Sequence, residues 1–418
     1  MSKITKILIA NRGEIAARVI RTARSLGYRT VAVYSAADAG AFHVSEADQA
    51  VCIGPAAIGE SYLVGEKILD AAKLTSADAI HPGYGFLSEN AEFSKACEAM
   101  GIAFIGPPAD AIELMGSKRL SKIAMIEAGV RCIPGYQEAE QSEDTLIARA
   151  AEIGFPLMVK ASAGGGGRGM RLVFEKSELA ENIRIARSEA ENAFGSGELI
   201  LERAILEPRH IEIQVFADEF GNAVFLGERD CSIQRRHQKV VEEAPSPFVD
   251  PELRQRMGEA AVNAAKACNY RGAGTVEFLV DKDKNFYFLE MNTRLQVEHP
   301  VTELITGLDL VEWQLRIASG EELPLTQEEV TLTGHAVEVR LYAEDPRNNF
   351  MPQTGTVRLW HYPTRAGLRV DHGIHPGQEV SPFYDPMLAK IIAFGESRPK
   401  AIRRLASAVR DTQLLGIN

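Results

Sequence analysis

The sequence predicts a protein of mixed class, in which an α/β region with a parallel sheet precedes a region of mostly antiparallel strands. Three observations predict it. The N-terminal part alternates short apolar strands with an amphipathic helix, a pattern typical of a parallel sheet. From about residue 205 onward, strand-like segments follow one another between turn residues. The chain of 418 residues is too long for one typical core, so we expect two or three packed subdomains.

The N-terminal strands are short and apolar. They are expected at residues 4–10, 30–34, 77–80 and 102–105. Between the first two, residues 15–24 predict an amphipathic helix that ends at Gly27. A dinucleotide-binding unit would need three spaced glycines at the first turn, and only Gly13 stands there, so the sequence argues against that class.

Composition and charge narrow the function classes. The 46 basic and 57 acidic residues give a net charge of −11, which argues against a general nucleic-acid binder. The five cysteines form no CxxC pair, so neither a disulfide framework nor a zinc site is indicated. The apolar run at residues 7–10 is too short for a signal or membrane segment. We therefore expect a cytoplasmic protein with no membrane or nucleic-acid partner.

A glycine-rich loop occupies residues 163–169, between strands expected at 156–160 and 171–174. Successive glycines allow backbone N–H groups to converge on an anion. The loop is not a P-loop, because no Gly-Lys-Ser/Thr follows and the next element reads as a strand. Two interpretations stay open: a flap that closes over phosphates, with Lys160 beside it, or a flexible surface hairpin.

The segment 274–292 predicts a β-hairpin with a polar tip at residues 281–285. A turn centred between Asp283 and Lys284 places Glu277 opposite Glu290, with Asn292 on the same face. The other face would carry Val276, Phe278, Val280, Tyr287, Leu289 and Met291. Opposed carboxylates repel each other unless a cation lies between them, and Mg²⁺ prefers oxygen ligands. The alternative is a pair of solvated surface glutamates.

Two polar segments complete the set of candidates. In residues 292–300, extended spacing would direct Arg294, Gln296 and Glu298 to one side, where they could hold a small anion and accept its proton. The alternative is an ordinary polar loop with an Arg–Glu ion pair. Residues 229–239 are basic, which is typical of a solvated face, here with the neighbouring Glu242 and Glu243 as internal ion-pair partners.

Together these segments closely resemble the ATP-grasp fold and, within it, the biotin carboxylases of biotin-dependent acyl-CoA carboxylase α subunits. The matching segments are residues 7–16, 81–90, 160–170, 228–239, 290–303 and 342–346. The resemblance implies an N-terminal Rossmann-like α/β subdomain that precedes the ATP-grasp unit proper, and a mostly antiparallel C-terminal subdomain. The implied regions are 1–115, a linker 116–131, a lid with the glycine flap at 132–204, and 205–418. Because the family continues with helical sequence, we expect the C-terminal region to be truncated.

The resemblance also implies a function: MgATP- or MnATP-dependent carboxylation, by bicarbonate, of a biotin carried elsewhere, since no Ala/Val-Met-Lys-Met biotinyl motif occurs here. The implied partners are a biotin carboxyl carrier domain and a carboxyltransferase β subunit, in a homodimer or a larger hetero-oligomer. Residues 235–239 and 338–346 look closer to methylcrotonyl- or geranyl-type α subunits than to acetyl-CoA carboxylase.

By position, the resemblance assigns residue roles. ATP would be bound by Lys118, Lys160, Gly165, Gly166, Gly167, Glu202, Arg203, Ile205, His210 and His237. Metal would be held by Glu277, Glu290 and Asn292, bicarbonate by Lys239, Arg294, Gln296 and Val297. Glu298 would be the general base, Arg340 would stabilise the enolate of biotin, and Tyr84 would lie near the biotin ring. Arg203 stands where the family usually has lysine, which leaves that contact in doubt.

Two other functions remain as alternatives. One is a different ATP-grasp ligase, such as a carbamoyl-phosphate or purine-pathway enzyme. The positions of Lys239, Arg294, Glu298 and Arg340 argue against it. The other is a nucleotide-binding regulatory module without catalysis, and the filled metal and base positions argue against that.

Overall fold

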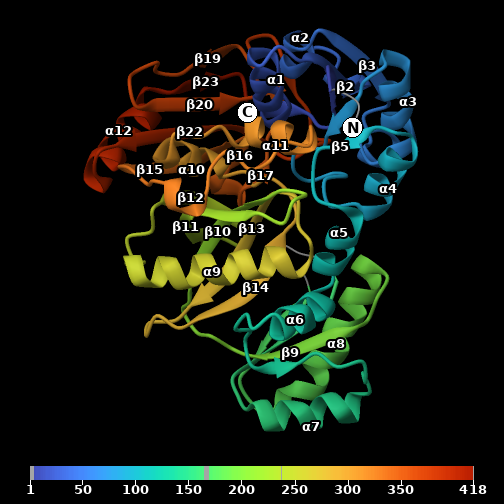
Figure 1. The fold of residues 1–418 in the computed structure, drawn as a ribbon, viewed down its shortest axis with the longest axis vertical. Helices are drawn as coiled ribbons and strands as arrows, with labels where there is room; N and C mark the ends of the chain where they lie inside the picture. Colours follow the sequence, from blue (N-terminus) through green and yellow to red (C-terminus); the bar gives the residue numbers. More distant parts are fainter. Residues whose placement is uncertain (1–3, 164–168, 237, 418) are drawn as a thin grey trace.

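The structure is a computed structural model that describes residues 4–163, 169–236 and 238–417, and these form a five-, an eight- and a four-stranded sheet with short two-stranded ribbons (Figure 1). The four-stranded sheet lies at one end of the long axis. The five-stranded sheet and the C-terminal strands lie at the other end, and strands β10–β14 lie between them. The predicted mixed class is confirmed.

The N-terminal sheet has the strand order β3-β2-β1-β4-β5, and its paired strands are parallel, as predicted. Its elements are β1 (Lys6–Ile9), α1 (Gly13–Ser25), β2 (Arg29–Ser35), α2 (Phe42–Glu46), β3 (Gln49–Gly54), α3 (Gly65–Thr75), β4 (Ala79–His81), α4 (Ala91–Ala99) and β5 (Ala103–Phe104). The loops after β1 and β4 leave the carboxyl ends of neighbouring strands, where parallel sheets place their ligand sites.

The four-stranded sheet follows two connecting helices, α5 (Ala109–Gly116) and α6 (Lys118–Glu127). Its order is β6-β9-β7-β8, and its elements are β6 (Gly135–Tyr136), α7 (Glu143–Ile153), β7 (Leu157–Ala161), β8 (Met170–Val173), α8 (Lys176–Phe194) and β9 (Leu199–Arg203). Lys160 pairs with Met170 in an antiparallel register, which confirms the predicted hairpin around the glycine loop. Most of that loop, including Gly165, Gly166 and Gly167, lies outside the described residues.

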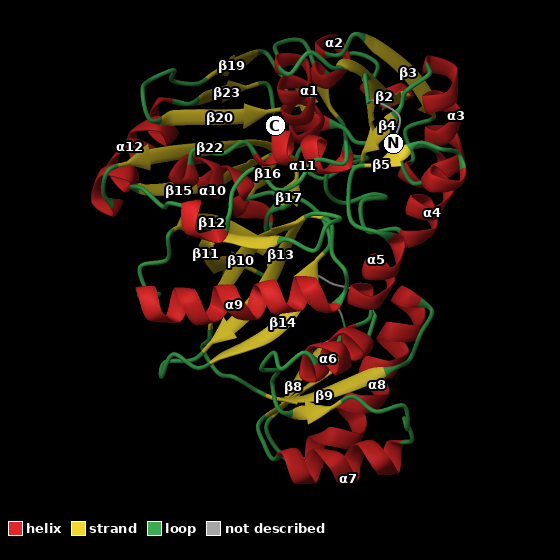
Figure 2. Cartoon of the chain, in the orientation of Figure 1, coloured by secondary structure: helices red, strands yellow, loops and turns green. Residues whose placement is uncertain are grey.

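The central sheet has the order β14-β13-β10-β11-β12-β15-β22-β20, with antiparallel pairs throughout. Its strands are β10 (Arg209–Ala217), β11 (Ala223–Arg235), β12 (Gln238–Ala244), β13 (Gly272–Val280), β14 (Phe286–Asn292), β15 (His335–Tyr342), β20 (Leu368–His372) and β22 (Met387–Gly395). The helices that pack near it are α9 (Pro251–Ala267), α10 (His299–Thr306), α11 (Leu310–Ala318) and α12 (Arg398–Asp411). Figure 2 shows α9 lying across the strands β10, β11 and β13.

The predicted hairpin 274–292 forms, and Glu277 pairs directly with Glu290 as expected. The register shifts by one residue beyond that pair, because Phe278 faces Phe288 and leaves Leu289 as an extra residue in a β-bulge. The predicted apolar face is therefore wrong near the turn. Phe288, not Leu289, joins the core, and Leu289 lines the same cavity as the two glutamates.

Short strands complete the C-terminal part: β16 (Glu344–Asp345), β17 (Met351–Pro352), β18 (Gly355–Thr356), β19 (Leu359–His361), β21 (Glu379–Val380) and β23 (Gln413–Leu415). The subdomain boundaries given above stay predictions. Among the described residues, we find no helix with the length and apolar content needed to cross a bilayer.

Candidate active site

A cavity of about 890 Å³ lies where the lid, the N-terminal loops and the central sheet meet. It gathers most of the residues that the sequence singled out. Those lining it are Tyr84, Lys118, Lys160, Arg203, Ile205, His210, Lys239, Glu277, Glu290, Asn292, Arg294, Gln296, Val297, Glu298 and Arg340. Glu202 is buried beside the cavity, and His237 lies outside the described residues.

At the lid end, Glu202 holds two lysines. Its carboxylate accepts hydrogen bonds from Lys122 Nζ at 2.8 Å and from Lys160 Nζ at 2.5 Å, and all three side chains are buried. Burial alone raises the pKa of Glu202, but the two ammonium groups outweigh it and the net pKa is lowered. Lys122 was not predicted. Its spacing of four residues from Lys118 on α6 was the available signal, because residues i and i+4 share a helix face.

The paired carboxylates face the cavity from neighbouring strands. Glu277 is buried, Glu290 is partly exposed, and Lys118 Nζ lies 3.6 Å from Glu290 Oε2. Burial and the charge of Glu277 raise the pKa of Glu290, as expected for two carboxyl groups that repel each other. Asn292 Nδ2 donates to Glu277 Oε1 at 2.8 Å, which keeps the amide on the same face. Two carboxylates and an amide oxygen are suitable ligands for a divalent cation, so this donor set fits Mg²⁺.

His210 and Glu212, both on β10, lie beside Glu277. Ligand atoms of His210, Glu212 and Glu277 lie within 4.8 Å of one another, and His210 Nε2 is 2.7 Å from Glu277 Oε2. Burial lowers the pKa of His210, but the Glu277 carboxylate raises it more, so the net pKa is above its ordinary value. Glu212 was not predicted, although the alternation His210-Ile-Glu212 along β10 places both polar side chains on one face.

Lys239 joins the metal side of the cavity to the base side. Its Nζ donates to Glu212 Oε2 at 2.5 Å, to Glu277 Oε1 at 2.8 Å and to Glu298 Oε1 at 2.8 Å. Burial lowers the pKa of Lys239, but these carboxylates outweigh it and hold the pKa well above its ordinary value. Lys239 is therefore a fixed positive charge between three acids.

Glu298 is fully buried at the N-terminus of α10. Its second oxygen accepts from Arg340 Nη2 at 3.0 Å, and Arg340 also contacts Glu242 at 2.6 Å. Burial raises the pKa of Glu298, yet Lys239 and Arg340 outweigh it and hold the net pKa well below its ordinary value. The carboxylate is thus kept ionised and able to accept a proton.

The segment after β14 brings its polar side chains to the cavity while Leu295 is buried in the core. Arg294 Nη1 donates to Gln296 Oε1 at 2.8 Å, and its Nε donates to Glu89 at 2.9 Å. The ion-pair partner of Arg294 is thus Glu89, from the loop before α4, and not a glutamate of its own segment. The guanidinium of Arg294 and the side-chain amide of Gln296 thus both line the cavity, where they can bind an anion.

Tyr84 enters the cavity from the loop after β4. Its hydroxyl donates to Glu14 Oε1, at the start of α1. Burial and the charge of Glu14 raise the pKa of Tyr84 well above its ordinary value, so it remains a neutral hydroxyl. His81, by contrast, is buried and bonds to Gln314 rather than facing the cavity.

The interpretation of the basic stretch 229–239 as a solvated face is wrong at its two ends, where Arg229 is buried and Lys239 lines the cavity, whereas Arg236 and Gln238 are exposed. Arg229 is fully buried and bonds to Glu212 at 2.5 Å. Glu242 pairs with Arg340, and Glu243 pairs with His335 and Arg398, so neither neutralises the stretch internally. A run of charges on a central strand can face a buried site instead of water, and its pattern alone does not distinguish the two.

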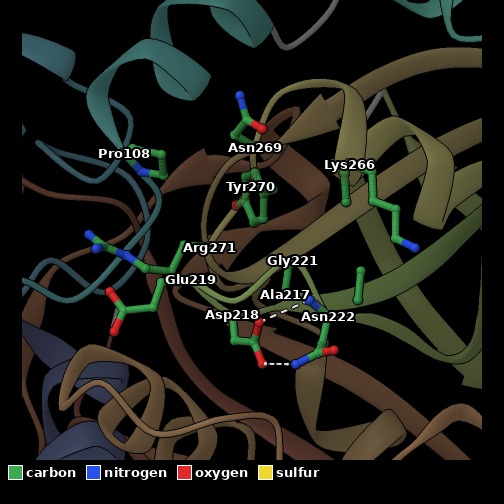
Figure 3. A pocket seen from close by; sticks show the side chains of 12 residues that line it. Pro108, Ala217, Asp218, Glu219, Gly221, Asn222, Lys266, Asn269, Tyr270 and Arg271 are labelled. Carbon is green, nitrogen blue, oxygen red and sulfur yellow. Dashed lines mark hydrogen bonds between the residues drawn. The ribbon is translucent and has the colours of Figure 1, made fainter.

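A smaller cavity of about 390 Å³ lies near the turn between β10 and β11 and the end of α9 (Figure 3). Asp218 there accepts from the backbone N–H and the side-chain amide of Asn222. Its lining contains none of the predicted site residues, and Lys266 and Arg271 lie on different sides of it. The chemistry of the larger cavity has no counterpart here.

Comparison with protein families gives three matches along the chain. The biotin carboxylase N-terminal domain matches residues 3–112, the ATP-binding domain of the carbamoyl-phosphate synthase L chain matches 117–326, and the biotin carboxylase C-terminal domain matches 338–418. The mitochondrial methylcrotonoyl-CoA carboxylase subunit alpha of Rattus norvegicus is 56% identical over 99% of this chain. A biotin carboxylase of Halalkalibacterium halodurans is 55% identical over 99% of this chain and 91% of its own length.

The chain is shorter than some of these relatives, and it also matches solved structures. The chain covers 58% of the rat subunit, so it spans little more than half of that relative. Among solved structures, the biotin carboxylase domain dimer of the Hydrogenobacter thermophilus 2-oxoglutarate carboxylase, in complex with MgADP, ADP and bicarbonate, has a TM-score of 0.95 and 48% identity. The match covers 100% of this chain and 92% of that one.

Proposed function

Because the chain belongs to the biotin carboxylase family of ATP-dependent ligases, we propose that it uses ATP and bicarbonate to carboxylate a protein-linked biotin. The observation that carries the proposal is the position of Glu298. Its carboxylate is held between Lys239 and Arg340 in the cavity that also contains Glu277 and Glu290. One cavity therefore offers a proton acceptor, an anion site and a cation site.

Glu298 is proposed to take the proton of bicarbonate. A bicarbonate ion next to Arg294, Gln296 and Lys239 would share the positive charge that now lowers the pKa of Glu298. The base would then gain proton affinity as its substrate binds, which suits general-base catalysis. The freed oxygen attacks the γ-phosphorus of ATP, the bond to ADP breaks, and carboxyphosphate forms. The Val297 backbone is a further proposed contact of bicarbonate.

ATP is proposed to lie between the lid and β13–β14. Lys118 and Lys160 would approach its phosphates, Arg203 and Ile205 line the cavity at the end of β9, and Glu202 and His210 stand nearby. The roles of Gly165, Gly166, Gly167 and His237 stay predictions, since they lie outside the described residues. Magnesium or manganese, held by Glu277, Glu290 and Asn292, would neutralise phosphate charge when bound.

The last step concerns biotin. Carboxyphosphate releases CO₂, its phosphate takes the proton from biotin N1, and N1 forms the new bond to carbon. Arg340 is proposed to stabilise the enolate oxygen of biotin, and Tyr84 to lie against the ring. A guanidinium fixed by Glu242 and Glu298 is preorganised for this charge, which is how electrostatic catalysis lowers a barrier.

Partners and location belong to the same proposal. We propose that a biotin carboxyl carrier domain delivers the biotin and a carboxyltransferase β subunit uses the product, within a homodimer or a larger hetero-oligomer in the cytoplasm. The methylcrotonoyl-CoA carboxylase and propionyl-CoA carboxylase relatives support an acyl-CoA carboxylase.

The test is ATP cleavage by the purified chain, followed as ADP release, with bicarbonate and free biotin varied independently. We expect cleavage to require bicarbonate and to rise with biotin, and labelled bicarbonate to appear in acid-labile carboxybiotin. Cleavage that depends on another acceptor would favour a different ATP-grasp ligase. Nucleotide binding without turnover by the complete subunit would favour a regulatory module. Lys266→Met, at the smaller cavity, serves as a control that should retain activity.

A further inference from the structure

Lys390, on β22, is a fully buried lysine that no step above uses. Its Nζ donates to the backbone carbonyl of Val297 at 2.7 Å and lies 3.3 Å from Glu14 Oε2. These two partners of Lys390 belong to different parts of the cavity. Val297 directly precedes the proposed base Glu298, and Glu14 accepts a hydrogen bond from the Tyr84 hydroxyl. The Lys390 ammonium group therefore contacts Val297, next to the proposed bicarbonate site, and Glu14, next to the proposed biotin site.

The location of this charge is costly. Lys390 is the direct register partner of Arg340 on β15, and like charges opposite each other on neighbouring strands repel. On the other side it faces Asp371, whose carboxylate already bonds to Arg369 and Arg21. The carboxylates of Glu14, Glu338 and Asp371 interact favourably with Lys390 and offset this cost, so removal of the ammonium alone would leave buried carboxylates short of a partner. Charge balance explains why a buried cation is tolerated here, but it does not explain why the ammonium is directed at the Val297 carbonyl.

The hydrogen bond from Lys390 to the Val297 carbonyl indicates a role in positioning the neighbouring Glu298. Val297 lies in the turn between Gln296 and the start of α10, so a fixed Val297 carbonyl fixes the peptide that carries Glu298. Glu298 must keep one oxygen at 2.8 Å from Lys239 and the other at 3.0 Å from Arg340. A small rotation of this peptide would move both contacts, and catalytic geometry tolerates little displacement.

We propose that Lys390 is a positioning residue for the carboxylation, an inference that rests on the proposed function. Its ammonium holds the Val297 carbonyl, and with it the Glu298 carboxylate, while the Glu14 carboxylate transmits the same restraint to the Tyr84 hydroxyl. Lys390 thereby couples the place where bicarbonate loses its proton to the place where biotin is received. It acts through these neighbours and contacts no substrate itself.

The test compares Lys390→Met, which removes the ammonium, with Lys390→Arg, which keeps a cationic donor. Lys122→Met is the matched control, because Lys122 is also a buried lysine but bonds to Glu202 at the lid. For Lys390→Met we expect kcat/KM for bicarbonate to fall at least about tenfold while KM for ATP changes less than about twofold. Lys390→Arg should recover part of the loss. Lys122→Met should instead raise KM for ATP.

Several results would overturn the proposal. A folded Lys390→Met with unchanged kcat/KM for bicarbonate would do so, as would an equal loss in all parameters that arginine does not rescue. If Lys390→Met does not fold, Glu14→Gln tests the other side: KM for biotin should rise with KM for ATP unchanged, and an unchanged biotin response refutes the relay.

A second readout does not depend on turnover. Amide hydrogen exchange in residues 293–300 should be faster in Lys390→Met than in the unmodified chain, with no change in β10 and β11. An unmodified chain without bicarbonate-dependent ATP cleavage would refute the proposed function. In that case exchange alone decides whether Lys390 holds the Val297 segment, and an unchanged exchange rate there refutes the positioning role.

Discussion

The two faces of strands β12, β15 and β22 differ sharply in what they bury. One face packs Val337, Ile391 and Ala393 against Ala401 and Leu405 of α12. The other face, beside α10, buries the charged side chains Glu242, Glu338 and Lys390 and carries the partly exposed Arg340, with a smaller apolar patch around Ile392. Alternation along a strand makes such a division possible within one element.

Stability and the proposed chemistry depend on different faces of these strands. Apolar burial stabilises the fold through area removed from water, and the α12 face provides it. Buried charges gain little net stability, because desolvation opposes their mutual attraction. We infer that the charges nearest Glu298 on the α10 face, Arg340 and Lys390, are kept for the proposed chemistry. Substitutions on the two faces should affect different measurements.

Glu298→Gln, on the α10 side, should reduce activity more than any other substitution on these strands and their neighbours. The amide keeps the shape but cannot accept the bicarbonate proton, so bicarbonate-dependent ATP cleavage should fall by about 100- to 10,000-fold. Thermal unfolding should change little, because Lys239 and Arg340 each keep another carboxylate partner. Steady-state kinetics and a melting curve check this. Retained bicarbonate-dependent cleavage would remove Glu298 from the role of base.

On the α12 face, Ile391→Ala should do the reverse. Ile391 is buried in the cluster with Val337 and Leu405, and truncation of such a side chain costs about 2–5 kcal/mol of unfolding free energy. KM for bicarbonate should stay unchanged in the protein that remains folded. Denaturant unfolding and kinetics below the melting temperature provide the comparison. A selective loss of bicarbonate affinity would show that the faces are not independent.

Part of this arrangement followed from local sequence. The pair Glu277–Glu290 was predictable because both residues belong to one hairpin and alternation fixes their face. The bulge at Leu289 was not, since one extra residue leaves the apolar pattern of β14 almost unchanged. The first strand–helix–strand unit followed from the same local pattern, but β3 (Gln49–Gly54) and the order of the strands in the sheet were not predicted.

Contacts between residues far apart in the sequence could not be predicted from local patterns. Arg340 and Glu242 are 98 residues apart, and their meeting depends on β12 pairing with β15. Lys390 and Val297 are 93 residues apart, and no pattern in either segment points to the other. Burial of Arg229 beside Glu212 likewise reverses the usual meaning of a charged run. Strand order, which a single sequence does not contain, decides such pairs.

A smaller effect is expected for Glu338→Gln on the α10 face. Both side-chain oxygens of Glu338 are buried and lack a hydrogen-bond partner within the described residues. Burial raises the pKa of Glu338 well above its ordinary value, Lys390 opposes this, and Glu242 adds to it. The folded state therefore binds a proton that the unfolded state releases, so stability falls as pH rises above the ordinary carboxyl range.

Replacement of Glu338 by glutamine removes this dependence of the unfolding free energy on pH. We expect Glu338→Gln to match the unmodified chain near pH 5 and to exceed its unfolding free energy by about 1–3 kcal/mol at pH 8, the usual penalty of an unpaired buried polar group. Burial also raises the pKa of Glu242 to about 7, which adds a similar slope up to neutral pH in both proteins. Urea unfolding at the two pH values tests the difference. A variant less stable at pH 8 would mean that the carboxylate is stabilising there.

The smallest effect is expected where a charge borders the apolar face, at Arg398. Its guanidinium lies 2.6 Å from Glu243, but its side chain is 45% exposed, and water and salt screen such a pair. Arg398→Ala should therefore lower the unfolding free energy by less than about 1 kcal/mol, and less again in high salt. Glu243 keeps His335 at 2.7 Å, so no buried charge loses its last partner. Bicarbonate kinetics should not change, because Arg398 begins α12, on the face away from Glu298. A large or salt-independent loss would mean that charges stabilise this face too, and the division between an apolar, stabilising face and a charged, catalytic one would then fail.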